Sequence, residues 1–219
     1  MAFYDELHEA TAEGQAYVRS APIIATAMAG RATRAQYLAF LTQAYYHVRH
    51  TTPLLMACGA RIPAHMEWLR EAVAHYIEEE IGHQEWILND IRVIGGDVEA
   101  VRHGQCAIET ELMVSYAYDT VMRGNPVGFF GMVFVLEGTS VHLATQAATV
   151  LQSSLDLPSS AFSYLSSHGS LDMTHIEDFR GVVNRLENAD DRAAVLHCAK
   201  VFFRLYGDVI RTIPQGEKA

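Results

Sequence analysis

Residues 126–155 read PVGFFGMVFVLEGTSVHLATQAATVLQSSL, and this stretch decides the fold. Its apolar residues recur every three or four positions, which is the spacing of a helix that turns one face toward a core. One carboxylate, Glu137, interrupts that face. The stretch therefore predicts a long core helix with an acid near its middle. The predicted face consists of Phe130, Phe134, Glu137, Val141, Ala144, Ala148 and Leu151.

The same helical spacing recurs along the rest of the chain, and alternating strand patterns are absent. Proline, glycine and capping residues divide the chain into seven main helices, and Pro53 is expected to kink or divide the second one. Long helices joined by short loops predict an all-α, up-and-down bundle, and residues 1–219 are expected to form one domain. The predicted helices are 4–19 (followed by a short segment at 23–29), 34–60, 63–94, 97–122, 126–155, 159–186 and 188–210. Ser159 or Ser160 is expected to cap the sixth, and Asn188 to Asp190 the seventh.

Two other predicted helices also carry acids and histidines in the middle of an apolar face. In the third helix the face reads Leu69, Val73, Tyr76, Glu80, His83 and Ile87. In the sixth it reads Leu165, His168, Asp172, His175, Phe179, Val182 and Leu186.

Buried acids and imidazoles in this arrangement point to a metal centre. A carboxylate in an apolar interior loses several kcal/mol of hydration unless a partner compensates. Residues three apart on a helix point the same way, so Glu80 with His83, and Asp172 with His175, can each reach one ion. Mixed carboxylate and imidazole ligands suit iron or manganese. No cysteine is suitably placed for structural zinc.

Simpler interpretations of these residues stay open. The spacing of an acid and a histidine three apart is common, and Asp5 with His8 also has it near the N-terminus. Residues 78–80 could form a solvated acidic run, and His168 could lie in a loop. A buried Glu137 is harder to explain without a partner. The strength of the metal hypothesis is that all six candidates fall on core faces of long helices.

Composition excludes several classes of function. The net charge of −10 disfavours binding to nucleic acid or to an anionic membrane surface. No apolar stretch has the composition of a bilayer span. The three cysteines form no CxxC pair, and no secretory signal is visible, so a cytoplasmic location is expected.

The order of these motifs resembles a known enzyme family. Glu80-x-x-His83, then Glu137, then His168-x-x-x-Asp172-x-x-His175, together with the sequence YYHVRHTTPLL at 45–55, resembles the haem-oxygenase-like di-iron oxidases and oxygenases. The resemblance implies a seven-helix, TenA-like bundle. It also implies two iron ions, or iron and manganese, held by these three histidines and three carboxylates.

The resemblance further implies a reaction and its partners. We expect O2 as co-substrate, an external reductant with a possible electron donor, and a small organic substrate such as an amino acid or a fatty acid. A homodimer is the expected assembly. Two alternatives stay open: a metal-free enzyme of the TenA thiaminase or pyrroloquinoline-quinone synthase kind, and a non-catalytic binding protein on the same bundle.

Five residues are candidates for contacts with the substrate or with the metal ligands. Tyr76 and Phe134 could line a substrate pocket, although ordinary core packing is the alternative. His47 lies on a core face of the second helix and could contact a metal ligand or the substrate, although an ordinary core histidine is the alternative. Arg49 and Arg180 could bind a substrate carboxylate, although ion pairs with nearby acids are the alternative.

Overall fold

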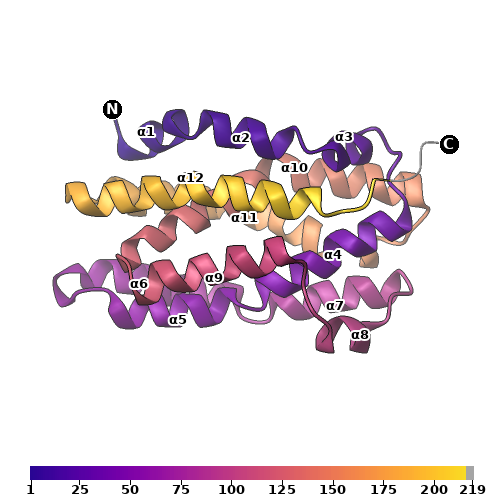
Figure 1. Ribbon diagram of the computed structural model, residues 1–219, viewed down its shortest axis with the longest axis horizontal. Helices are drawn as coiled ribbons and strands as arrows, with labels where there is room; N and C mark the ends of the chain where they lie inside the picture. Colours follow the sequence, from indigo (N-terminus) through magenta and orange to yellow (C-terminus); the bar gives the residue numbers. More distant parts are fainter. Residues whose placement is uncertain (216–219) are drawn as a thin grey trace.

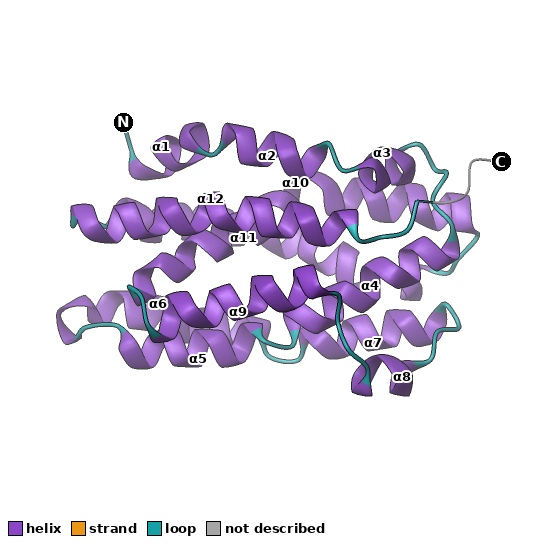
Figure 2. Ribbon diagram, in the orientation of Figure 1, coloured by secondary structure: helices purple, strands orange, loops and turns teal. Residues whose placement is uncertain are grey.

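The computed structural model describes the backbone of residues 1–215 and their side chains, except those of 140–142 and 168–175. Helices account for the regular structure of this part of the chain, and it contains no strand (Figure 2). The twelve α-helices are α1 (Phe3–Ala10), α2 (Ala12–Arg19), α3 (Pro22–Met28), α4 (Arg34–Val48), α5 (Thr51–Arg61), α6 (Glu67–Glu80), α7 (His83–Val93), α8 (Val98–His103), α9 (Ile108–Met122), α10 (Phe130–Leu155), α11 (Ser163–Asn184) and α12 (Ala189–Arg211). Three short 3₁₀-helices are η1 (Ala64–Met66), η2 (Pro126–Phe129) and η3 (Ser159–Ala161).

Most of the long helices run along the long axis of the molecule (Figure 1). Helix α10 packs against α11 and α12, and α12 also packs against α2 and α9. Helix α4 packs against α7, and α5 packs against α6 and α9. The all-α bundle predicted from the sequence is therefore confirmed.

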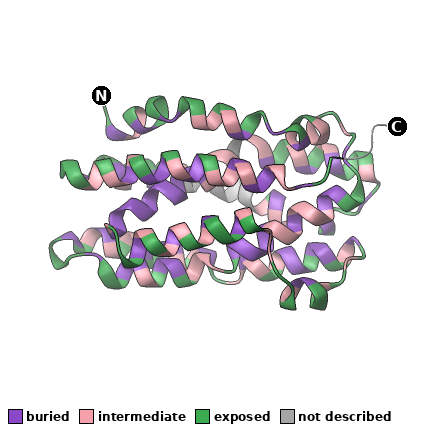
Figure 3. Ribbon diagram, viewed as in Figure 1, coloured by how far each residue is buried: buried purple, intermediate pink, exposed green. Residues whose placement is uncertain are grey.

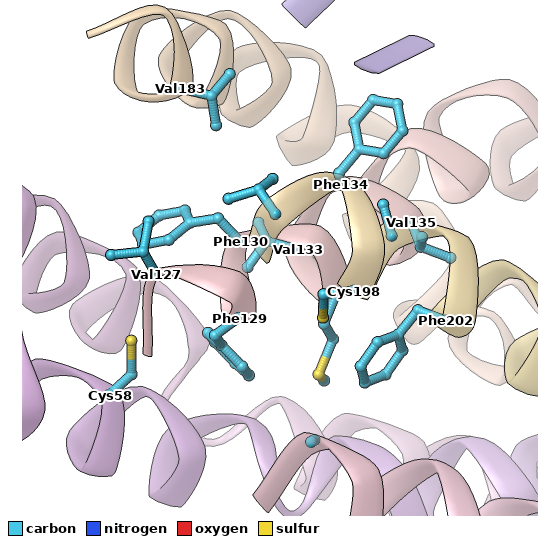
Figure 4. Packing of buried hydrophobic residues seen from close by; sticks show 14 of the residues in the cluster. Cys58, Val127, Phe129, Phe130, Val133, Phe134, Val135, Val183, Cys198 and Phe202 are labelled. Atoms are coloured by element: carbon cyan, nitrogen blue, oxygen red, sulfur yellow. The ribbon is translucent and has the colours of Figure 1, made fainter. Parts of the chain in front are cut away.

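The hydrophobic core forms around residues 126–155, the stretch predicted to be a long core helix. Phe130 and Phe134 are buried on α10, with Phe129 at the end of η2 and Phe202 on α12 beside them (Figure 4). Gly131 lets α10 and α12 approach closely, because a β-carbon there would lie 2.5 Å from the backbone of α12. Buried residues line the inner faces of the helices and exposed residues the outer ones (Figure 3). Burying this apolar face from water is the main favourable contribution to the fold.

The expected count of seven helices is wrong in detail, because several predicted helices are divided. The first divides at Thr11, and the second at Arg49 and His50, which places Pro53 in the first turn of α5. A proline in that position costs little, since first-turn amides lack partners within the helix. The fourth divides near Gly104 into α8 and α9. Each division lets the chain turn while the apolar face stays in the core.

Helix caps agree with the prediction at the start of α12 and differ from it at the start of α11. Asn188 caps α12 by accepting hydrogen bonds from the amides of Asp190 and Asp191, as predicted. Thr33 caps α4 in a reciprocal arrangement with Gln36. The predicted cap of the sixth helix by Ser159 or Ser160 is wrong, because these residues form η3 and α11 begins only at Ser163.

Helix α10 is bent near its centre. The segment Pro126–Thr139, formed by η2 and the first part of α10, makes an angle of 41° with the segment Leu143–Leu155. In the described part of the chain no single helix is long and apolar enough to cross a membrane, and only these two bent segments pass that test of length and composition together.

Candidate metal centre

Glu80 and His83 form a buried acid–imidazole pair at a break between two helices. Glu80 is the last residue of α6 and His83 the first of α7. Their side chains meet with His83 Nδ1 3.1 Å from Glu80 Oε2. The His83 ring also lies against Trp86, with 4.0 Å between ring centroids. Both residues of the pair are buried, as their positions in the apolar face predicted.

The expectation that one continuous helix carries this pair is wrong. Gly82 has φ +95°, a left-handed conformation that ends α6 and starts α7. Glycine adopts this conformation without the penalty that a β-carbon brings. The pair therefore meets across a turn, where the spacing of three residues still brings the two side chains together.

Glu137 supplies a second buried carboxylate, from α10. It borders a cavity of about 80 Å³ that Glu80 borders from α6, and we call this space the acid-lined cavity. Tyr76 borders it as well. Burial raises the pKa of Tyr76, and the negative charges of Glu137, Glu79, Asp178 and Glu80 raise it further. Both cavity carboxylates thus act on the same phenol, while His83 joins the site through its contact with Glu80.

The three remaining predicted ligands lie outside the described side chains. His168, Asp172 and His175 fall within the bounds of α11, and the structure describes none of their side chains. Among the residues whose side chains are described, no three His, Cys, Asp or Glu lie close enough together to hold one metal ion. The six-ligand set therefore stays a prediction, of which the structure places Glu80, His83 and Glu137.

Asp90, which the sequence analysis did not single out, ties α11 to α7. Its carboxylate is fully buried. It accepts hydrogen bonds from the amide of Ser163 (3.1 Å), the hydroxyl of Ser163 and the amide of Tyr164 (2.9 Å). Burial raises the pKa of Asp90, and these hydrogen bonds oppose the rise. The helix that carries His83 therefore also holds the first turn of the helix that carries the three further predicted ligands.

Two of the five candidates for substrate or ligand contacts border the acid-lined cavity. These are Tyr76 and His47, and His47 makes an edge-on contact with the ring of Tyr206 at 6.1 Å. Phe134 lies in the core, and its ring packs against Phe179 at 5.9 Å.

The two arginine candidates lie elsewhere. Arg49 is exposed, with its guanidinium over the rings of Tyr45 and Tyr46. Arg180 is exposed, 3.7 Å from Asp5 and over the ring of Tyr4. Neither is among the described residues around the cavity. Arg180 fits the ion-pair alternative, and surface pairs of this kind contribute little stability.

The fold defines the class of protein. A solved domain of unknown function with a haem-oxygenase-like fold, from Shewanella denitrificans OS217, is similar with a TM-score of 0.85 and 22% identity, covering 97% of this chain and 92% of that one. A TenA homologue from Pseudomonas syringae pv. tomato has a TM-score of 0.79 and 10% identity, with coverages of 97% and 92%. Haem oxygenase-1 from the cyanobacterium Synechocystis, in complex with haem, has a TM-score of 0.73 and 11% identity, again with coverages of 97% and 92%. At these identities the likeness establishes the fold, which is haem-oxygenase-like and TenA-like.

The sequence places the chain more narrowly. A model of the family described as iron-containing redox enzymes matches residues 38–207, so this chain belongs to that family. No curated protein sequence matches it. The matched range includes all six predicted ligands as well as Asp90 and Tyr206.

Proposed function

We propose that this chain is a non-haem di-iron, or iron–manganese, oxidoreductase that uses O2 to oxidise a small organic substrate. The observation that carries the proposal is the burial of Glu80 and Glu137 at one cavity in the core, with the buried His83 in contact with Glu80. Two carboxylates in such a place need compensating positive charge. Membership of the iron-containing redox enzyme family supports iron as the source of that charge.

The donor set fits the proposed metal. Carboxylate oxygens and imidazole nitrogens are ligands that iron and manganese accept. Glu80, His83 and Glu137 would hold the ions together with His168, Asp172 and His175. When bound, the ions supply the redox chemistry with O2, and an external electron donor supplies the reducing electrons.

The protein contributes a dry site and fixed polar groups. Leu55, Met132 and Val133 border the acid-lined cavity and keep most of its wall apolar. Tyr76 borders the same cavity, and its phenol, which like that of any ordinary tyrosine is protonated at neutral pH, is a hydrogen-bond donor. His47 lies at the same cavity and is the candidate for orienting a ligand or the substrate.

Anaerobic loading with Fe(II) tests the proposal. Metal analysis and Mössbauer spectroscopy should show about two irons per chain, and the loaded protein should consume O2 once its substrate and a reductant are present. Glu137→Gln should lose iron. The control Glu111→Gln changes an exposed acid on α9 and should keep it. Equal iron contents in the two variants would contradict the assignment of Glu137.

The same experiment separates the alternatives. A metal-free enzyme of the TenA thiaminase or quinone-synthase kind would bind no stoichiometric iron. A non-catalytic binding protein would consume no O2 under any condition. The homodimer, the electron donor and the cytoplasmic location belong to this proposal too, and sedimentation of the loaded protein tests the dimer.

A further inference from the structure

A second cavity, which we call the apolar cavity, lies between α3, α4, α10, α11 and α12. Its volume is about 130 Å³, and aliphatic and aromatic side chains form most of its wall, among them Ala27, Met28, Phe40 and Ala147. In Figure 1, α3 lies near the C-terminal end of α12 and in front of α10. The wall is built from helices at this end of the bundle, whereas the acid-lined cavity includes residues of α5 and α6.

Two polar side chains in this wall, those of Gln36 and Tyr37, are used by the fold. The side-chain amide of Gln36 donates to the carbonyl oxygen of Pro214 at 2.8 Å. The hydroxyl of Tyr37 donates to the carbonyl oxygen of Ala161 at 2.9 Å. The interior surface of the apolar cavity therefore offers contacts mainly to hydrocarbon.

Two tyrosines connect the apolar cavity to the candidate metal centre. Tyr164 from α11 and Tyr206 from α12 border both cavities. Burial raises the pKa of Tyr206 to about 12, although part of its side chain is accessible. A raised pKa and partial accessibility are expected together for an interior ring whose accessible face lines a cavity. The two spaces thus lie on either side of a common wall.

We infer that the apolar cavity binds a neutral hydrocarbon part of the substrate, whose reacting end passes Tyr164 and Tyr206 to reach the acid-lined cavity. The identification of this ligand as the substrate rests on the proposed function. The capacity of the cavity to bind hydrocarbon does not. Neither tyrosine was singled out from the sequence, because nothing in the local pattern around them differs from core packing.

Size and chemistry favour this assignment. A cavity of about 150 Å³ lined by aliphatic and aromatic side chains takes up benzene, so one of 130 Å³ has room for a comparable group. The acid-lined cavity, at about 80 Å³, is smaller and would also have to hold the metal ions. A charged or strongly polar group in the apolar cavity would lose hydration without gaining partners. The substrate is therefore expected to carry a hydrocarbon group there, and free polar amino acids fit less well.

Binding of benzene to the metal-free, full-length protein tests the cavity itself. Methyl-13C labelling of methionine gives a suitable signal, because Met28 borders the apolar cavity while Met56 and Met122 are exposed. Benzene should shift the Met28 methyl resonance saturably and leave the two exposed methyls unchanged. Equal, non-saturating shifts at all three would overturn the inference.

Variants that fill the cavity provide the controls. Ala147→Leu, from the α10 wall, should weaken benzene binding at least tenfold. Ala27→Leu, from the α3 wall, should also weaken benzene binding at least tenfold. It replaces the first variant if that one fails to fold. Ala72→Leu is the matched control, since Ala72 is a half-buried helical alanine outside the described wall of the apolar cavity. Unchanged affinity in both cavity variants would contradict the proposed site.

Mn(II) tests whether the cavity serves the metal centre. With Mn(II) bound, the protons of bound benzene should relax faster, and Ala147→Leu should remove this effect while Mn(II) stays bound. Saturable benzene binding without faster relaxation would separate the cavity from the site and overturn its role in substrate binding. Failure of Mn(II) and iron to bind would instead contradict the proposed function, and the metal-free measurement would still decide whether the cavity binds hydrocarbon.

Discussion

Two acid–histidine pairs lie within nine residues of each other, and they differ sharply in burial. His75 Nε2 lies 3.3 Å from Glu79 Oε1, and His83 Nδ1 lies 3.1 Å from Glu80 Oε2. The side chains of the first pair are 59% and 28% exposed, whereas those of His83 and Glu80 are 2% and 10% exposed. Similar chemistry at similar distance therefore occurs once at the surface and once in the core.

The difference teaches that burial, more than spacing, separates the candidate metal-binding pair from the surface pair. A pair at the surface is solvated whether or not it forms, and its contribution to stability is about 0–1 kcal/mol. A buried pair has lost its hydration, so it destabilises the core unless further charges compensate. We interpret the buried pair, with Glu137 nearby, as one side of a metal site, and the exposed pair as an ordinary surface contact.

Metal binding should give the largest difference in the free energy of unfolding between variants of the two pairs. At a concentration of Mn(II) one hundred times its dissociation constant, a ligand that binds only the folded state raises the free energy of unfolding by about 2.7 kcal/mol. Glu80→Gln should reduce this stabilisation strongly, while Glu79→Gln should keep it. Urea unfolding with and without Mn(II) measures both. Equal losses in the two variants would remove the distinction between the pairs.

Loss of the Asp90 carboxylate should have an effect of similar size. Asp90→Ala leaves the part-buried amides of Ser163 and Tyr164 without their acceptor, and each such loss costs about 1–3 kcal/mol when the donor is fully buried. Asp90→Asn keeps one acceptor oxygen and should cost less. Urea unfolding gives the free energies. If α11 is held by Asp90 as the structure indicates, hydrogen exchange should also quicken in its first turn, and an unchanged rate there would contradict this role.

The fold and the burial of Glu80 and His83 were predictable from the sequence. The helix break between these two residues was not predicted. The face that contains Glu80 and His83 follows from helical spacing alone, and both residues are buried as expected. Gly82 carried a usable signal, since a glycine inside a helix costs about 1 kcal/mol relative to alanine. Asp90 continues the same face after Ile87, so extending the predicted face by three residues would have found it.

Two glycines allow the turn between the members of the buried pair to be tested. Gly82 and Gly95 have φ +95° and +81°, and a β-carbon added at either one would meet no atom of the described structure within 4 Å beyond its immediate chain neighbours. Alanine at either position should therefore destabilise by about 1 kcal/mol, through backbone strain alone. Only Gly82→Ala should also weaken Mn(II) binding, because Gly82 sets the approach of His83 to Glu80. A Mn(II) titration of both variants measures this, and equal affinities would contradict it.

The exposed pair should give the smallest effect. His75→Ala removes a surface contact between residues four apart on a helix, which is worth about 0.3–0.5 kcal/mol. Where His75 carries a proton, the effect should shrink further at high salt, since exposed charges are screened. Urea unfolding at two salt concentrations checks this. A loss above 1 kcal/mol would show that the exposed pair has a structural role that its exposure does not reveal.

The rest of the site depends on contacts that no single stretch of sequence encodes. Glu137 could be predicted because an acid inside the apolar face of a core helix needs a partner. Tyr164 and Tyr206 could not, because their position between two cavities is set by how α11 and α12 pack against the other helices. The sequence also could not show whether Arg49 binds a substrate carboxylate. Its stacking on Tyr45 and Tyr46 follows from the local turn at the end of α4.

A crystal structure of the anaerobically iron-loaded protein, with anomalous differences recorded at the iron edge, tests the central claim most directly. We predict iron peaks within bonding distance of Glu80, His83 and Glu137, with no peak beside His75 and Glu79. Fully loaded crystals whose iron lies away from the buried acids, or beside the exposed pair, would contradict the account.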